Sequence, residues 1–418
     1  MIFYLNMILA KSRLSNLNPG IINLISKIIY TISIYSNLLL VLIIFDSFEY
    51  GIYVYIFALI QLLTLFTNYG FQVLSLREFS KDKNSNSLFV YLRIVFCFSI
   101  LGFLLMLFLI SIKIQNWKLD TYLVYLIPCV FFFNAYPILE NFLRARNNVY
   151  YLFSNIVFIT ISLFIKLIIY INAANFEIFL LMLFLDPFMY FVVTLFFVKK
   201  QLKVDKKYEN KNENYLQSIA SSTHFFISSL FIYLYYKVDV FLIEYLIGYE
   251  ALGNYSKAVF IINIVLIFFT ALISGMLPEY YKNKKFLDFR NLLLALFFVM
   301  IFMYLVIPSN NFVMRFILLN HESLEVFYIY MLTMPFVLIG SLLNAILHKN
   351  NLESAIGRNS ILVVIIHIPL SFILIKTYGL IGSCYASVLS FFIASIFLPY
   401  IFIDTRRFIV SFFKAVLT

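Results

Sequence analysis

Charged residues are scarce in this sequence, and so are the residue types that build disulfide and metal sites. Of its 418 residues, 12% are charged, 3 are cysteine and 4 are histidine. The cysteines lie inside apolar runs and form no CxxC pair, which argues against a disulfide framework. The histidines show no HExxH or paired spacing, and no Walker A, GxGxxG or GxSxG motif occurs. We therefore expect no metal, no cofactor and no nucleotide hydrolysis.

Hydrophobic residues make up 63% of the chain, and the mean hydropathy is +0.96. A soluble domain is about 45–50% apolar and about 25% charged, so this composition is typical of a membrane protein. Apolar runs of about 20 residues, enough to cross a bilayer, recur from end to end. We predict an all-α polytopic membrane protein with about twelve transmembrane helices. The predicted spans are 21–45, 51–76, 88–112, 121–143, 149–171, 176–198, 217–246, 254–280, 291–308, 325–347, 356–376 and 380–403.

Lys and Arg residues are distributed unevenly between the two sides of these spans. Most basic residues outside the spans lie at the termini and in the even-numbered loops, and the odd-numbered loops hold only Lys113, Lys118, Arg315 and Lys376. Positive loops stay in the cytoplasm, so we predict cytoplasmic termini. The net charge of +11 reflects this bias and does not indicate nucleic-acid binding. The segment 1–16 lacks the features of a signal peptide, and we interpret it as interfacial.

The second half of the sequence matches the first at an offset of about 202. EYGIYVYIFALI begins at Glu49 and ALGNYSKAVFII at Ala251, while RARNNVYY at 144–151 faces LHKNNLES at 347–354. Parallel repeats of this kind form the two halves of some transporters. We therefore predict two six-helix bundles related as parallel repeats. Their predicted bounds are 1–198 and 217–418, joined by a basic cytoplasmic linker at 199–216.

Two charges of opposite sign interrupt the apolar run IYLYYKVDVFLIEYL at 232–246. Lys237 lies about ten residues, or roughly 15 Å, from the predicted outer end, near the midplane of a core about 30 Å thick. Asp239 follows two positions later, so the two side chains point in nearly opposite directions. We predict that one faces a central cavity and that the other packs against a polar partner in its own bundle. A buried pair that only fixes helix packing is the alternative.

Other charged residues also lie within the spans, and some of them can place their charge at the membrane interface. Arg93, Lys166 and Lys257 lie near span ends, where long side chains can reach the interface. Lys27 is expected to line the same cavity near the cytoplasmic surface. Asp186 precedes a proline that we expect to break span 6. The excess of intramembrane cations suits an anionic cargo, and the carboxylates suit charge compensation or ion coupling.

Several ordered motifs resemble one transporter superfamily. The stretch KVDVFLIEYLIGYEALGNYSKAVFII at 237–262 resembles its span 7 to span 8 pattern, an Asp followed by an apolar run and G-x-Y. The segment 48–81 resembles its first signature, and TYGLIGSCYASVLSFF at 377–392 resembles its span 11 to span 12 turn. Together these motifs are similar to those of the polysaccharide flippases of the multidrug/oligosaccharidyl-lipid/polysaccharide exporter superfamily. Murein-precursor flippases usually carry further C-terminal spans, which favours the polysaccharide branch.

The resemblance implies a carrier and not an enzyme. Its cargo would be an O-antigen-type oligosaccharide on undecaprenyl pyrophosphate, moved to the outer leaflet of the bacterial inner membrane for lipopolysaccharide or other surface polysaccharide assembly. A coupling ion (H⁺ or Na⁺), membrane lipids and a polysaccharide polymerase are the further implied partners. We predict that Lys237 and Lys27 contact the pyrophosphate, with Lys257 and Arg93 as secondary contacts. Asp239 and, less strongly, Asp186 are the predicted ion-coupling carboxylates.

Two alternatives share the membrane setting. A multidrug or cation extruder of the same superfamily would have the same fold, but it should prefer a carboxylate-lined cavity. A membrane glycan polymerase, ligase or acyltransferase would need an outer loop that carries catalytic groups. The longest predicted outer loop, at about 309–324, holds only Arg315, His321 and Glu322 for such a role.

Overall fold

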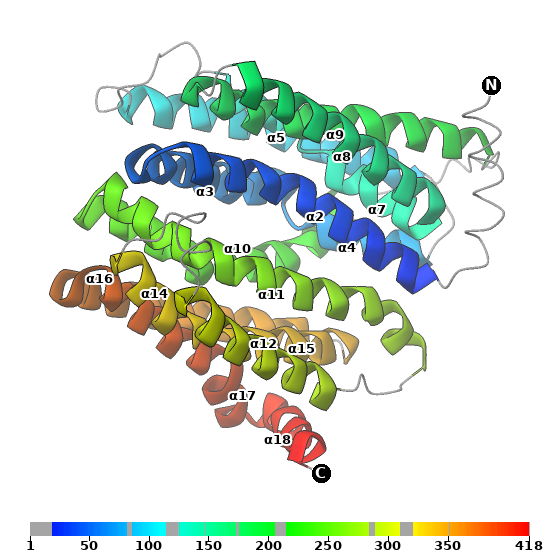
Figure 1. The fold of residues 1–418 in the computed structure, drawn as a ribbon. Coiled ribbons are helices and arrows are strands. Elements are labelled where there is room, and N and C mark those ends of the chain that lie inside the picture. Colours follow the sequence, from blue (N-terminus) through cyan, green and yellow to red (C-terminus); the bar gives the residue numbers. More distant parts are fainter. Residues whose placement is uncertain are drawn as a thin grey trace. The chain divides into compact units, whose positions relative to one another are not determined.

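The computed structural model describes most of the chain as helix (Figure 1). The described residues are 19–81, 86–113, 124, 126–146, 148–172, 175–204, 215–283, 289–309, 321–350 and 352–417. All elements assigned in these ranges are helical, which confirms the predicted all-α class. The predicted interfacial segment 1–16 and residues 205–214 of the predicted linker lie outside them.

The chain forms two compact units. Unit 1 comprises Met1–Asn37 and Ile60–Phe226, and unit 2 comprises Leu38–Leu59 and Ile227–Thr418. Helices α2 (Pro19–Ile44), α3 (Ser47–Asn68) and α10 (Tyr215–Leu246) therefore each contribute one part to each unit. The division into bundles 1–198 and 217–418 stays a prediction.

Unit 1 is built from antiparallel and broken apolar helices. In addition to its parts of α2, α3 and α10, it contains α4 (Phe71–Lys81), α5 (Asn86–Lys113), η2 (Ile127–Phe133), α7 (Tyr136–Arg146), α8 (Asn148–Asn172) and α9 (Phe176–Val204). Helix α4 packs against α7, and α9 packs against α7 and α8. Helix α9 is continuous through Pro187, so the predicted break of span 6 at this proline was wrong.

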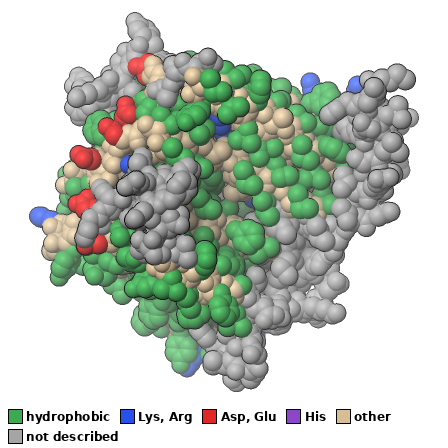
Figure 2. All heavy atoms as spheres, in the orientation of Figure 1, with side chains coloured by type: hydrophobic (Ala, Val, Ile, Leu, Met, Phe, Trp, Pro, Cys, Tyr) green, Lys and Arg blue, Asp and Glu red, His purple; other side chains and the backbone are tan. Residues whose placement is uncertain are grey.

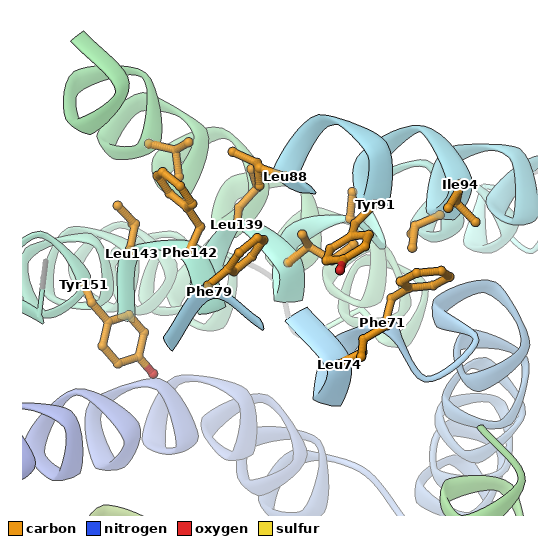
Figure 3. Packing of buried hydrophobic residues seen from close by; sticks show 14 of the residues in the cluster. Phe71, Leu74, Phe79, Leu88, Tyr91, Ile94, Leu139, Phe142, Leu143 and Tyr151 are labelled. Atoms are coloured by element: carbon orange, nitrogen blue, oxygen red, sulfur yellow. The ribbon is translucent and has the colours of Figure 1, made fainter. Parts of the chain in front are cut away.

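The main core of unit 1 is aromatic and joins short helices to long ones. Phe71 and Phe79 on α4, Tyr91 on α5 and Phe142 on α7 pack together with several leucines (Figure 3). Phe79 meets Phe142 edge to face, with ring centroids 5.7 Å apart. Edge-to-face rings add about 0.5–1.5 kcal/mol to the free energy gained by burial. This core fixes the short α4 and α7 segments against the long helices around them.

Unit 2 contains the longest helices. Besides its parts of α2, α3 and α10, its elements are α11 (Tyr249–Asn283), α12 (Phe289–Ser309), α14 (His321–Met331), α15 (Met334–Lys349), α16 (Glu353–Phe392), η3 (Ile393–Phe397), α17 (Leu398–Ile401) and α18 (Ile403–Leu417). Helix α14 packs against α11 and α16, and α15 packs against α11. The segment η3 is a π-helical turn.

Helix α16 is a helical hairpin. Gly379 adopts a non-helical conformation within it, with φ 60° and ψ −138°. In a straight helix His367 and Ser390 would be about 34 Å apart at 1.5 Å per residue. Their side chains are instead 2.6 Å apart, so the chain reverses at Gly379. This reversal confirms the predicted turn between the spans 356–376 and 380–403.

Two predicted spans are broken at corresponding places in the two halves. The predicted span 121–143 is a 3-10 segment, η2, and a short α7, separated at Asn134–Ala135. The predicted span 325–347 is α14 and α15, which are separated at Leu332–Thr333 and bent by 40°. Each break precedes a proline at the second position of the next helix, where the missing N–H costs nothing. The equivalence of these breaks supports the internal repeat.

Two glycines of the sequence repeat meet within unit 2. The Cα of Gly51 on α3 lies against the carbonyl of Tyr249, and that of Gly253 on α11 lies against the carbonyl of Ser47. A Cβ at either glycine would overlap the facing carbonyl oxygen. Residues 47 and 249, like residues 51 and 253, are related by the same offset of about 202. The crossing is therefore pseudo-symmetric, and both glycines are required by close backbone approach.

Apolar side chains cover most of the described surface seen in Figure 2. Large examples include Phe164 (63% exposed) in unit 1 and Phe298 (68% exposed) in unit 2. Within the described ranges, 8 helices are long and apolar enough to cross a membrane, or 9 if the bent α14–α15 pair forms one span. This count takes Ser354–Ile401 as one span, although its chain reverses at Gly379. The chain is a multi-pass membrane protein.

Candidate functional site

A buried carboxylate forms the centre of a polar cluster in unit 2. Asp239 on α10 is 3% exposed. Its Oδ1 accepts a hydrogen bond from Ser371 at 3.1 Å and lies 3.3 Å from Nε2 of His367. Its Oδ2 accepts hydrogen bonds from Tyr255 at 3.3 Å and from Ser387. A carboxylate offers about four acceptor positions, and these neighbours occupy all four.

His367 connects the two arms of the α16 hairpin. Its ring is fully buried, and its Nδ1 lies 2.6 Å from the hydroxyl of Ser390. When Nε2 carries the proton toward Asp239, Nδ1 is free to accept from Ser390. The pair can therefore hold a proton on either member while the serines keep both groups hydrogen-bonded. We call Asp239, His367, Ser371, Ser387 and Tyr255 the Asp239 cluster.

Other titratable side chains pack close to this cluster. Tyr330 on α14 is 5% exposed and stands edge to face with Tyr255, with 6.0 Å between the ring centroids. Cys384 lies on the second arm of α16 and is completely buried. Phenol and thiol groups stay neutral when they are buried in apolar surroundings. Tyr330 and Cys384 therefore add no charge next to Asp239 and His367.

Lys237 lies outside the Asp239 cluster. Its side chain is half-buried, and no described acidic residue lies within salt-bridge distance of its ammonium group. Of the two residues, Asp239 is thus the one that packs against polar partners of its own unit, as predicted for one of them. The two charges do not form a pair.

A buried ion pair occupies unit 1. The ammonium of Lys166 on α8 lies 2.8 Å from Asp186 on α9 and donates to the carbonyl of Ser33 at 2.9 Å and the hydroxyl of Ser36 at 3.2 Å. Ser162 donates to the other oxygen of Asp186 at 2.8 Å. Lys166 is 1% exposed, so the prediction that it reaches the interface was wrong. The favourable geometry of the pair with Asp186 compensates its desolvation.

Lys27 stands beside a group of buried tyrosines in unit 1. Its ammonium is 4.0 Å from Glu140 and 5.1 Å from the centroid of the Tyr30 ring. Glu140 also accepts a hydrogen bond from Tyr151 at 2.8 Å. The Lys27 side chain keeps 32% of its surface exposed. It is therefore accessible to an anion, although its charge is partly balanced.

The two secondary cations differ in exposure. Lys257 on α11 is 3% exposed and donates to Ser47 at 3.0 Å, so it is buried inside unit 2. The prediction that it reaches the interface was wrong. Arg93 on α5 is exposed and donates to the hydroxyl of Tyr215 at 3.1 Å in unit 1. Among the described residues, no group of three or more His, Cys, Asp or Glu side chains is arranged to hold a metal ion.

A sequence profile of the polysaccharide biosynthesis protein family matches residues 20–283, which is more than half of the chain. The chain belongs to the polysaccharide biosynthesis protein family. No protein from a search of curated sequences matches it.

Solved structures with the same fold are transporters and flippases. The lipid II flippase MurJ in an inward closed conformation has a TM-score of 0.61 at 15% identity, covering 96% of this chain and 90% of that one. The eukaryotic MATE transporter AtDTX14 has a TM-score of 0.61 at 10% identity, covering 98% and 99%. An outward-facing multidrug resistance MATE transporter of the MOP superfamily has a TM-score of 0.61 at 12% identity, covering 97% and 99%. At these identities the likeness shows the fold.

Sequence reasoning on this member of the polysaccharide biosynthesis protein family missed most of the Asp239 cluster. His367, Ser371 and Ser387 of the cluster, and Ser390 beside it, all lie in apolar spans, so neither a search for charged residues nor one for paired histidines finds them. A signal was present, because His367 and Ser371 are one helical turn apart and Ser387 and Ser390 share a face of the returning arm. Small polar residues that share a helix face inside a membrane span indicate a buried polar partner.

Proposed function

We propose that this protein is a flippase for lipid-linked oligosaccharide. It moves repeat units on undecaprenyl pyrophosphate from the cytoplasmic to the outer leaflet of the bacterial plasma membrane, where surface polysaccharide is assembled. Transport proceeds by alternating access and is coupled to an ion. The orientation with both termini in the cytoplasm follows the distribution of basic residues.

One observation carries the proposal. A chain whose sequence belongs to a polysaccharide biosynthesis family has the same fold as the lipid II flippase MurJ. Fold alone does not assign a substrate, and a family name alone does not assign a step. Their combination favours translocation of the finished lipid-linked saccharide over its synthesis.

The cations provide the cargo contacts in this proposal. Lys237 is the first candidate for the pyrophosphate, because it is half-buried and forms no ion pair with a described residue. Lys27 is the second, because part of its side chain is exposed while Glu140 balances its charge. Arg93 is exposed and remains a secondary contact. Lys257 is also secondary, and it must leave Ser47 before it can reach an anion.

The Asp239 cluster provides the coupling site, and we assign the coupled ion as a proton. A sodium ion needs several oxygen ligands with free lone pairs, whereas Asp239 already accepts from three hydroxyl groups and has His367 Nε2 at 3.3 Å. Nε2 of His367 lies 3.3 Å from the carboxylate, which is close enough for a proton to pass between the two groups. Asp186 is a weaker candidate, because Lys166 already neutralises it.

A multidrug or cation extruder is the second candidate, since MATE transporters share the fold. The buried carboxylate at Asp239 is the observation that favours it. The deep lysine at 237 opposes it, because a cation near this position would be repelled. A glycan polymerase or ligase has less support, and residues 310–320 of its expected outer loop lie outside the described residues.

The proposal is tested in a strain that lacks this gene. Lipid-linked oligosaccharides are extracted, their leaflet is assigned with a membrane-impermeant glycosidase, and surface glycan is measured. We expect complete repeat units to accumulate on the inner leaflet and surface glycan to be lost. Outward-facing units that accumulate without being polymerised would instead indicate an enzyme that acts after translocation. No change in either pool, together with drug sensitivity, would indicate an extruder.

A further inference from the structure

Unit 2 contains a cavity that none of the proposed charged contacts explains. Its volume is about 170 Å³, and its walls come from α10, α15, both arms of α16, and the π-helical turn η3. An apolar cavity of about 150 Å³ accommodates a benzene ring, so this one has room for a single six-membered ring. A π-helical turn inside a longer helix frequently marks a functional site. The cavity therefore has both the size and the backbone irregularity of a binding site.

The cavity wall combines aromatic faces with neutral polar groups. Tyr235 and Tyr236 on α10 surround Phe391 on α16, with ring centroids 5.7 and 4.7 Å from that of Phe391. Asn344 and Asn359 supply amides at the same wall. The wall residues include no Lys, Arg, Asp or Glu within the part of the chain that the structure describes. Such a lining suits a neutral ligand with apolar faces and hydrogen-bonding edges.

One wall residue lacks the partner that its burial requires. Asn359 is 7% exposed, and its Oδ1 is buried without a hydrogen bond to any described residue. A buried amide oxygen without a partner costs about 1–3 kcal/mol. Rotation of the Asn359 side chain would bring this oxygen to a hydroxyl group in the cavity, which would donate to it. An acyl chain would leave it unsatisfied, and an ionic ligand would find no counter-charge in the wall.

We propose that this cavity is a binding subsite for one neutral sugar residue of the cargo. The C–H faces of a pyranose ring would stack on Tyr236 and Phe391, and its hydroxyls would bond to Asn344 and Asn359. Lys237, the first candidate for the pyrophosphate, follows Tyr236 directly on α10. The inference rests on the proposed function, and it adds that unit 2 recognises the sugar itself and not only the charged linkage.

The test separates sugar recognition from pyrophosphate recognition. The purified protein is titrated with undecaprenyl pyrophosphate and with the same lipid carrying a neutral oligosaccharide, and the ratio of the two affinities is measured. Asn359→Leu removes the amide, and Gly340→Leu fills the cavity from α15. Loss of a hydrogen bond to a hydroxyl should lower affinity for the glycosylated lipid about tenfold and leave that for the bare lipid unchanged.

Two variants control for folding. Ser383→Ala and Thr270→Ala each remove a hydroxyl that donates to a carbonyl of its own helix and that does not line the cavity. Both should bind the two lipids like the wild type. The subsite is refuted if the wild type binds both lipids equally, or if the Leu variants change both affinities together or neither. If the proposed function is wrong, the wild type should bind neither lipid, and this outcome differs from those that refute the subsite.

Discussion

The Asp239 cluster joins three helices through one carboxylate. Substitution of Asp239 by Asn keeps the shape but turns two accepting lone pairs into donating hydrogens. Donors from Ser387 and Tyr255, or from Ser371 and His367, would then face an NH₂ group. A mismatch of this kind in a buried network costs about 1–3 kcal/mol. The substitution also removes the carboxylate that is proposed to carry the proton.

We therefore predict that Asp239→Asn lowers proton-driven transport at least about tenfold. The transport rate against external pH checks this prediction, since the pH dependence should flatten in Asp239→Asn and in His367→Gln. The control is Ser383→Ala, because the buried Ser383 hydroxyl donates to the carbonyl of Leu380 and not to the cluster. An unchanged pH profile in both variants would remove the coupling role from this cluster.

The ion pair between Lys166 and Asp186 has a structural role in this account. Removing one partner leaves an uncompensated buried charge, so Lys166→Met should destabilise the protein by about 3–5 kcal/mol. The double variant with Asp186→Leu should regain most of that free energy of unfolding. Thermal unfolding in detergent measures both. Transport by the double variant should stay within about threefold of the wild type, and a complete loss would return Asp186 to the coupling machinery.

The pseudo-symmetry of the repeat can be tested where α3 crosses α11. A methyl group at Gly51 or Gly253 overlaps a facing carbonyl oxygen, so each Gly→Ala change must push the two helices apart. We expect Gly51→Ala and Gly253→Ala to lower the unfolding temperature of unit 2 and to impair transport to a similar degree, because their surroundings are pseudo-equivalent. Gly340→Ala, whose added methyl group would meet only the Cβ of Ser395 at 3.5 Å, is the matched control for the unfolding temperature. Strongly different effects of the two substitutions would contradict the pseudo-symmetry of the crossing.

Helix α18 is held to α16 by an exposed ion pair. The guanidinium of Arg358 donates to both oxygens of Asp404, at 3.0 and 3.1 Å, and lies 3.7 Å from the centroid of the Phe402 ring. These hydrogen bonds hold the pKa of Asp404 below its ordinary value. The pair is therefore fully formed at neutral pH, and its contribution is lost as the pH falls through the lowered pKa of the carboxyl.

We predict that Asp404→Asn lowers the free energy needed to open α18 at pH 7 by no more than about 1 kcal/mol, because both partners are partly exposed. Limited proteolysis of the C-terminal segment at pH 7 measures the opening of α18. Arg407→Ala, which removes an exposed charge outside this pair, should not change the cleavage rate. Equal cleavage of Asp404→Asn and the wild type would show that other contacts hold the helix.

Hydropathy predicted the helical elements well where they are continuous. It located the turn at Gly379 because a glycine and a tyrosine follow a basic residue between two apolar runs. It missed the breaks at Tyr69–Gly70, Asn134–Ala135 and Leu332–Thr333, since one or two residues change the mean of a window of about 19 residues only slightly. The break predicted at Pro187 does not occur, because a proline is tolerated inside a membrane helix when neighbouring groups satisfy the freed carbonyl.

The site was harder to predict than the fold. Charge inside a span is visible in a sequence, so Asp239 and Lys237 were found. The sequence does not show which charge pairs with which, because the partners come from distant helices. Lys166 and Asp186 are an example, and so are Asp239 and His367, which lie on α10 and α16. Pairing is decided by tertiary packing, and only the structure resolves it.

The whole molecule, as proposed, combines a cationic contact for pyrophosphate, a neutral cavity for sugar and a proton site in one membrane carrier. Each of the three has a different chemical signature, so each can be disabled separately. Lys237→Met should weaken binding of undecaprenyl pyrophosphate with and without sugar by similar factors, about tenfold or more, because a desolvated charge pair is lost. Direct binding measurements with both lipids test this, and Arg77→Met serves as a control outside the proposed site.

The most direct test of the central claim is a flipping assay with the purified protein in proteoliposomes. A lipid-linked oligosaccharide is incorporated, and its exposure to an added membrane-impermeant glycosidase is followed over time. The account predicts faster exposure than in protein-free vesicles, a rate that responds to an imposed pH gradient, and a loss of at least about tenfold in Asp239→Asn and Lys237→Met. Exposure no faster than in protein-free vesicles, together with export of an organic cation by the same preparation, would contradict the account.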